Sequence, residues 1–128
     1  MEVILDSHTL IWAMDDPSRL SPTATALIRN PDVVLHLSPA TYWEMAIKVA
    51  LGKLPLSMPD RRWMNTAIAT LDLRIPPISL DHTERTTLLP LHHKDPFDRM
   101  LAAQSLANGV PLLSADVVFD AYGVNRVW

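Results

Sequence analysis

The chain of 128 residues contains no cysteine. This absence excludes disulfides, thiolate zinc sites and cysteine nucleophiles, and it is what we expect of a protein in the reducing cytoplasm. No apolar run approaches the roughly 18 residues that a membrane span needs. The opening stretch MEVILDSHTL has neither a basic start nor a small-residue cleavage site, so the sequence predicts a cytoplasmic protein without a signal peptide or membrane contact.

Positive charge is also in short supply, since the formal net charge is −3 at pH 7 and the pI is about 5.9. This mild acidity argues against a protein that coats duplex DNA. It does not argue against a nuclease, because metal ions can reverse the local sign of a carboxylate pocket. The length fits one hydrophobic core, and we find no repeat or linker, so we expect a single domain over residues 1–128.

Glycine is scarce, with three residues, whereas the eleven prolines fall mostly between apolar segments. A capping residue followed by proline marks a helix start at Ser21, Ser38 and Asp95, and Gly52 and Gly109 mark helix ends. The patterns predict strands over residues 3–5, 33–37, 111–114 and 124–127, and helices over 7–14, 22–29, 38–51, 59–71, 81–89, 95–108 and 117–122. Residues 74–78 are broken by proline and are at best an edge strand.

Short apolar strands that alternate with helices are typical of an α/β fold. Parallel strands need crossover connections, and helices then cover both faces of the sheet. The sequence therefore predicts a central, mainly parallel sheet flanked by helices. Ligands of such sheets bind outside the carboxyl ends of the strands.

Four acidic residues stand where this fold would bring them toward that edge. Asp6 closes the first strand, Glu44 lies six residues past the cap Ser38, Asp98 lies in a first helical turn, and Asp116 follows the third strand. Carboxylates are the hard oxygen ligands that Mg²⁺ and Mn²⁺ prefer. A metal held there can orient water and stabilise charge during phosphodiester hydrolysis, so the cluster predicts a metal-dependent nuclease.

Each acid also has a simpler interpretation. Asp6 and Asp116 are equally placed to cap the helices that follow them. Glu44 has Lys48 four residues on, which is the spacing of a solvated surface ion pair. Asp98 lies near a helix N-terminus, where the helix dipole favours any acid.

Three segments taken together resemble a known family: ILDSHTLIW, SPATYWEMAIK and HHKDPFDRMLAAQSLANGVPLLSAD. They are similar to the PIN-domain toxins of bacterial toxin–antitoxin pairs, the VapC-like group, and the resemblance extends over residues 3–128. It implies a three-layer α/β/α fold and an endoribonuclease dependent on Mg²⁺ or Mn²⁺. It also implies an RNA substrate, a small antitoxin that covers the active site, and a homodimer.

The resemblance further implies that Asp6, Glu44, Asp98 and Asp116 are the catalytic and metal-binding residues, with Asp120 close to the last of them. By the same resemblance, the hydroxyl groups of Ser7 and Ser114 could contact a ligand or water. Capping is the simpler role for both serines.

Several other residues are candidates for contacts with RNA. Basic side chains could contact phosphates, or could belong to solvated helix faces: Lys48, Lys53, Arg61, Arg62, Lys94 and Arg99. Trp12, Trp43 and Trp63 have apolar neighbours and are expected in the core or at an interface, although Trp63 beside two arginines could also stack on a base. His8 is expected in the core or at the surface, with RNA contact as the alternative. The pair His92-His93 is expected at the surface or in a loop, with metal binding as the alternative.

Other functions remain open in the sequence. A catalytically silent PIN-like module would keep the fold and only bind or dimerise. A phosphoacceptor domain would need a late lysine, yet no lysine follows Lys94, and a haloacid-type phosphatase would need an aspartate where His8 stands. The four acids favour the nuclease over all three.

Overall fold

The computed structural model describes residues 1–91 and 94–128 of the chain. Its sheet has four strands in the order β2-β1-β3-β4, and all three strand pairs are parallel. The strands are β1 (Glu2–Leu5), β2 (Val34–Leu37), β3 (Leu112–Leu113) and β4 (Arg126–Val127). The helices are α1 (Ser7–Asp15), α2 (Pro22–Arg29), α3 (Pro39–Ala50), α4 (Asp60–Leu71), α5 (Leu80–Leu88) and α6 (Pro96–Asn108), with the 3₁₀ helices η1 (Pro17–Arg19) and η2 (Val117–Tyr122).

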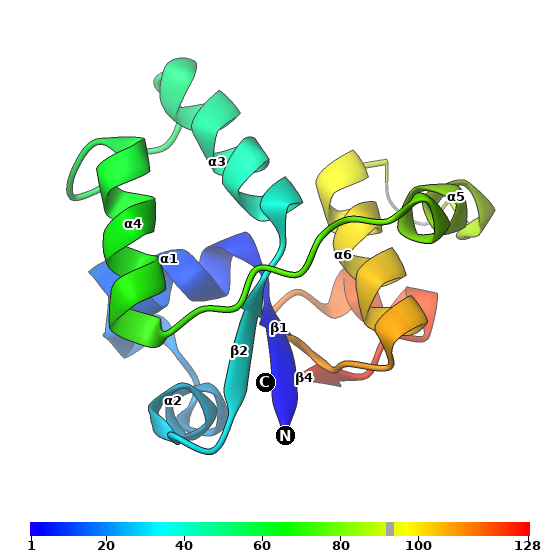
Figure 1. Cartoon of the computed structure of the whole chain (residues 1–128), viewed down its shortest axis with the longest axis horizontal. Coiled ribbons are helices and arrows are strands. Elements are labelled where there is room, and N and C mark those ends of the chain that lie inside the picture. Colours follow the sequence, from blue (N-terminus) through cyan, green and yellow to red (C-terminus); the bar gives the residue numbers. More distant parts are fainter. Residues whose placement is uncertain (92–93) are drawn as a thin grey trace.

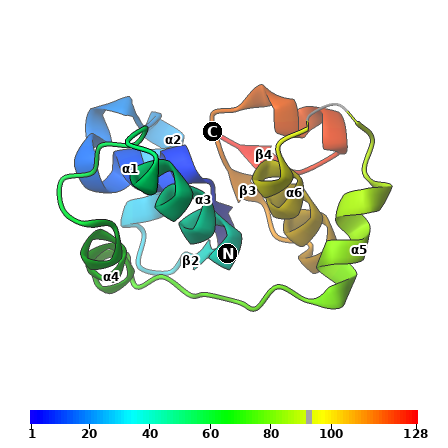
Figure 2. The same ribbon diagram turned by 90° about the horizontal axis from the view of Figure 1, so that it is seen from above.

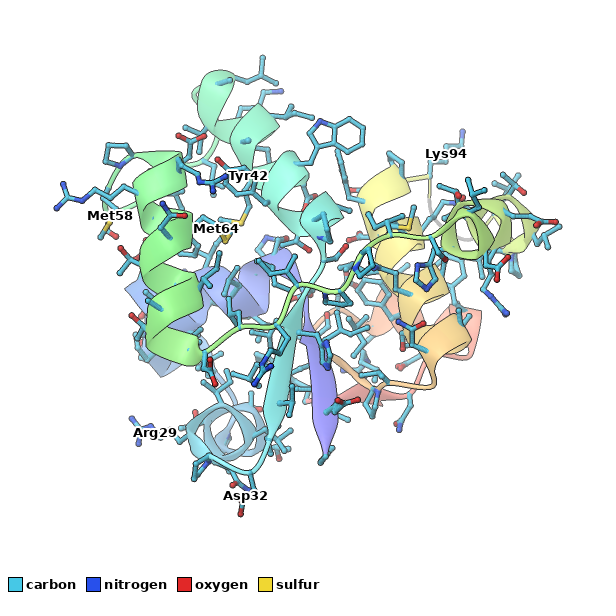
Figure 3. The ribbon with its side chains drawn as sticks, viewed as in Figure 1. Arg29, Asp32, Tyr42, Met58, Met64 and Lys94 are labelled. Carbon is cyan, nitrogen blue, oxygen red and sulfur yellow. The ribbon has the colours of Figure 1, made fainter. Side chains whose placement is uncertain are left out.

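Helices lie on both sides of this sheet, which confirms the predicted three-layer α/β fold. Helices α1 to α4 lie on one side and α5 and α6 on the other, as Figure 1 shows. The side chains of β1 alternate between the two faces of the sheet and so contribute to the core on each face. Val3 and Leu5 belong to the core on the α1–α4 side, and Ile4 belongs to the core beneath α6 and η2. Tyr42 and Met64 meet between α3 and α4 (Figure 3).

The predicted helix starts are confirmed in atomic detail. Ser21 and Ser38 accept hydrogen bonds from the backbone N–H of Ala24 and Ala40, and each cap is followed by a proline. Asp95 caps α6 in the same way. These caps matter because α3 and α6 begin at the carboxyl edge of the sheet and stand on either side of it (Figure 2).

Two of the expected elements differ from the prediction. Residues 74–78 form no strand; Arg74 makes only an isolated parallel bridge with His36 of β2. Pro76 and Pro77 explain this, because neither has an N–H to donate to a ladder. The expected helix over residues 117–122 is present as the 3₁₀ helix η2.

The tryptophans are distributed unevenly. Trp63 is 1% exposed and donates from Nε1 to the Asp15 carboxylate at 3.0 Å, so it belongs to the core and is closed to base stacking. Trp43 is 63% exposed, so of its two predicted locations, core or interface, the core is wrong and the interface stays a prediction. Within the described ranges, every helix is too short or too polar to serve as a membrane span.

The buried strand β1 should dominate the stability of the molecule. Leu5→Ala, at a fully buried position, is expected to lower the free energy of unfolding by about 2–5 kcal/mol, because it leaves a cavity under both α1 and α3. Leu80→Ala is the matched control, since Leu80 is 88% exposed and its loss should change stability by less than about 0.5 kcal/mol. Urea denaturation followed by circular dichroism measures both, and equal losses would contradict this description of the core.

Candidate active site

Asp6 directly follows β1, and the residue is only 4% exposed. One carboxylate oxygen, Oδ1, accepts from the backbone N–H of Thr9 at 2.8 Å, which makes Asp6 the N-cap of α1. The other, Oδ2, accepts from the hydroxyl of Ser114 at 2.5 Å. The capping interpretation of Asp6 is therefore confirmed, and the same carboxylate faces the end of β3.

Ser114 is the residue that joins the strand ends. It is fully buried, and its backbone N–H donates to the carbonyl of Val127 at 3.1 Å. Its hydroxyl donates to Asp6 and accepts from the backbone N–H of Asp116 at 3.0 Å. The N-cap of η2 is Asp116, although the Ser114 hydroxyl accepts a backbone N–H in the manner of a cap. The position of Ser114 just past β3, the neighbour of β1, is the sequence signal for the contact with Asp6.

Glu44 lies in α3 and is 5% exposed. The predicted pair with Lys48 is present, with Nζ 3.1 Å from Oε2. The two side chains differ in burial, because the side chain of Glu44 alone is 6% exposed and that of Lys48 is 43% exposed. The interpretation as a solvated surface pair was therefore wrong for the carboxylate, which lies inside the molecule with its cation at the rim.

Asp98 is half-buried in the first turn of α6. Asp95 fixes that turn, because its Oδ1 accepts from the backbone N–H groups of Phe97 and Asp98 at 2.8 and 3.3 Å. The rings of Trp43 and Phe97 meet edge to face, with centroids 5.2 Å apart. Since Trp43 and Phe97 directly precede Glu44 and Asp98, this contact brings the two acidic stretches of α3 and α6 to the same level above the sheet.

Asp116 is exposed and accepts from the backbone N–H of Val118 at 3.0 Å, so its capping role for η2 is confirmed. Asp120 pairs instead with Arg126, whose Nε lies 2.9 Å from Oδ1. This hydrogen bond is the main reason that the pKa of the Arg126 guanidinium is raised. Arg126 also donates to the carbonyl of Ser114 at 3.1 Å and so braces the end of β3.

The donor chemistry of this edge fits a hard divalent cation. Asp6 and Glu44 supply buried carboxylate oxygens, which Mg²⁺ and Mn²⁺ prefer. Across residues 1–91 and 94–128, no three histidine, aspartate or glutamate side chains are grouped closely enough to enclose an ion by themselves. Mg²⁺ keeps several waters and usually takes one or two carboxylates, so the fit does not require such a group.

Two of the residues predicted to contact phosphate differ in burial. Arg99 is 8% exposed and donates to the carbonyls of Thr86, Leu89 and Pro90, so it holds the end of α5 and the segment after it, and its assignment to phosphate binding was wrong. Lys94 is exposed beside the start of α6 (Figure 3). The pair His92-His93 lies outside the described residues.

A mainly apolar groove of about 340 Å³ opens next to this edge. It is lined by Ala40, Trp43, Ile78, Thr86, Lys94, Pro96, Phe97, Arg99 and Met100. It therefore runs between α3 and α6, and both rings of the Trp43–Phe97 contact line it.

Comparison with known proteins gives one consistent family. The family model of the PIN domain matches residues 3–125. Ribonuclease VapC22 of Mycobacterium tuberculosis is 26% identical over 117 residues, which cover 89% of this chain and 86% of that protein.

Solved structures share the fold at lower identity. A chain of the VapBC2 complex of Rickettsia felis, crystallised with a promoter DNA fragment, superposes with a TM-score of 0.74 at 13% identity, covering 99% of this chain and 98% of that one. VapC20 of Mycobacterium tuberculosis, a Sarcin-Ricin loop cleaving toxin, gives 0.66 at 16% identity and 95% of each chain.

The hydrogen bond between Ser114 and Asp6 predicts a measurable stability difference. Ser114→Ala leaves the buried Oδ2 of Asp6 without its donor, so the free energy of unfolding should fall by about 1–3 kcal/mol. Ser18→Ala removes a comparable serine–aspartate bond, from Ser18 to Asp16, that lies exposed, and should cost less than about 0.5 kcal/mol. Urea titrations in the presence of a chelator compare the two. If the two variants lose the same stability, the Ser114 bond does not support the site.

Proposed function

Because this chain belongs to the PIN-domain family, we propose that it is a metal-dependent endoribonuclease and the toxin of a toxin–antitoxin pair. The observation that carries this proposal is the buried carboxylate of Asp6 at the carboxyl edge of the sheet, fixed by the Thr9 N–H and the Ser114 hydroxyl. The name of the relative VapC22, a ribonuclease, supports the choice of reaction.

In this proposal Asp6, Glu44 and Asp98 hold Mg²⁺ or Mn²⁺, with Asp116 at the exposed margin. The metal would lower the pKa of a bound water and stabilise charge on the phosphate. The chain itself contributes orientation, because two hydrogen bonds fix the Asp6 carboxylate before any ligand arrives. Lys48 neutralises the buried charge of Glu44 and leaves its partly exposed ammonium group close to an incoming phosphate.

Removal of a proposed metal ligand should abolish the reaction. Asp6→Asn and Asp98→Asn are each expected to lower Mn²⁺-dependent cleavage of single-stranded or structured RNA on the order of 100-fold or more, because a neutral amide binds the cation poorly. Asp32→Asn is the matched control, since Asp32 is exposed in the turn before β2, at the opposite edge of the sheet (Figure 3). Cleavage is followed on gels with end-labelled RNA, and circular dichroism verifies the fold of each variant.

The silent binding module is the alternative that this experiment must exclude. Calorimetry with Mn²⁺ adds a second readout, because wild-type protein should bind the ion and Asp6→Asn should bind it more weakly. Equal cleavage by all four proteins, or an absence of both cleavage and millimolar metal binding in wild type, would overturn the proposed reaction.

We further propose that the antitoxin seats an apolar segment in the groove between α3 and α6, and that the toxin forms a homodimer. The VapBC2 chain that shares this fold comes from a toxin–antitoxin complex, which supports a partner of this kind. The exposed ring of Trp43 lies on the wall of the groove, where a buried aromatic would contribute most to binding.

A charge placed in the groove should separate toxin from antitoxin. Trp43→Asp is expected to weaken binding of the antitoxin encoded beside this gene by about 10-fold or more. The reason is that binding would remove water from the new carboxylate and place it against an apolar segment. Leu51→Asp is the matched control, because Leu51, the C-cap residue of the same helix, is 62% exposed and lies outside the groove. Co-purification and calorimetry measure the affinity. Unchanged binding by Trp43→Asp would place the antitoxin elsewhere.

A further inference from the structure

Three aromatic side chains form a continuous cluster at the start of α1. The ring centroids of His8 and Trp12 are 5.7 Å apart, and those of Trp12 and Trp128 are 5.9 Å apart. The guanidinium carbon of Arg19 lies 5.8 Å from the centroid of the Trp12 ring. We call His8, Trp12, Trp128 and Arg19 the aromatic platform.

Two members of the aromatic platform, His8 and Trp128, are close along the chain to residues that hold the proposed active site. Helix α1 begins directly after Asp6, so His8 lies one residue beyond the first helical position. Trp128 follows Val127, whose carbonyl accepts from the N–H of Ser114, and the hydroxyl of Ser114 donates to Asp6. The platform therefore lies at the same carboxyl edge of the sheet as the carboxylates, on the α1 side.

The burial of these rings differs from that of a core cluster. His8 is exposed, and Trp12 and Trp128 are half-buried, whereas Trp63 is 1% exposed. Trp128 packs against the core with part of its surface and leaves the rest open. The partly open rings leave a π surface to solvent at a place where the substrate must approach.

The charged member of the platform is also accessible. The side chain of Arg19 is 63% exposed, and its Nε lies 3.2 Å from the carboxylate of Asp16, itself 50% exposed. A surface ion pair of this kind contributes little free energy and exchanges readily with another anion. The guanidinium can therefore serve a phosphate or a base while its aliphatic part stays against Trp12.

We infer that the aromatic platform binds a nucleobase of the RNA substrate and so positions the neighbouring phosphate at the carboxylates. Bases stack on aromatic rings and on arginine, whatever their sequence, because every base has a π face. The net charge of −3 makes such contacts more important, since the molecule as a whole does not attract a polyanion. This inference rests on the proposed function for the identity of the polymer, but not on cleavage.

Photochemical crosslinking tests the contact without the reaction. Wild-type protein is mixed, in the presence of a chelator, with single-stranded RNA hexamers that carry one 5-iodouridine, and the crosslinked peptides are identified by mass spectrometry. We expect crosslinks at His8, Trp12 or Trp128. Saturable crosslinks that map only to Trp43 or to the exposed arginines of α4, or no crosslink at all, would overturn the inference.

Affinity measurements with variants give the second readout. His8→Ala and Trp12→Ala should each weaken binding of the same hexamers by about 5- to 100-fold, the range for one stacked base. Trp12→Phe should stay within about 3-fold of wild type because it keeps a π face. Arg29→Ala, an exposed arginine at the opposite edge of the sheet (Figure 3), should bind like wild type.

An abasic RNA separates stacking from damage to the fold. Loss of the base should weaken binding to wild type as much as Trp12→Ala does, and should add little in that variant. If Trp12→Ala fails to fold, His8→Ala and the crosslinks decide. Crosslinks on the platform without cleavage under any metal would reject the proposed reaction alone. Metal-dependent cleavage, with wild-type affinity in His8→Ala and Trp12→Ala and no platform crosslink, would reject the platform alone.

Discussion

The site depends on one hydrogen bond, from the hydroxyl of Ser114 to the carboxylate of Asp6, which joins residues 108 positions apart. It exists because Leu5 and Leu113 are paired in parallel strands, so that the residues after both strands emerge at the same edge of the sheet. The cap to Thr9 uses the other oxygen of Asp6. An ionised carboxylate has about four lone-pair sites, and two donors leave acceptor capacity unused. Capping and metal binding are therefore compatible roles for Asp6, and a choice between them is not required.

Charge balance distinguishes Asp6 from Glu44 and Asp120. Glu44 has Lys48, and Asp120 has Arg126, as cationic partners within hydrogen-bonding distance. The two hydrogen bonds that fix Asp6 come from neutral donors, an amide and a hydroxyl. A buried carboxylate held by neutral groups gains more from a divalent cation than one whose charge is already compensated, because the desolvation cost is still to be offset. On this argument, a metal matters more for Asp6 than for Glu44.

The sequence predicted the parts of this structure that depend on local chemistry. The caps at Ser38 and Asp95, the ion pair of Glu44 and Lys48 and the alternation of strands and helices all follow from short patterns, and the structure confirms them. The burial of Glu44, the exposure of Trp43 and the use of Arg99 to hold backbone carbonyls could not be predicted in that way. Each depends on which helices face each other across the sheet edge, and helical periodicity gives the apolar side of one helix without naming its neighbour.

The same long-range placement bears on how the proposed ribonuclease, with its acidic net charge, would bind RNA. A basic nucleic-acid-binding protein gains affinity from phosphate contacts and counterion release, and a chain of net charge −3 has little of that attraction. Its binding must come from local contacts that do not depend on the net charge. The carboxylate edge provides one such contact if a cation bridges it to a phosphate, and the half-buried rings of Trp12 and Trp128 provide another, because stacking on a base involves no net charge. Both lie beside Asp6, since the chain turns from β1 into α1 there and β4 ends one strand beyond β3. The parallel sheet thus brings the two proposed contacts, one dependent on charge and one independent of it, to the same edge.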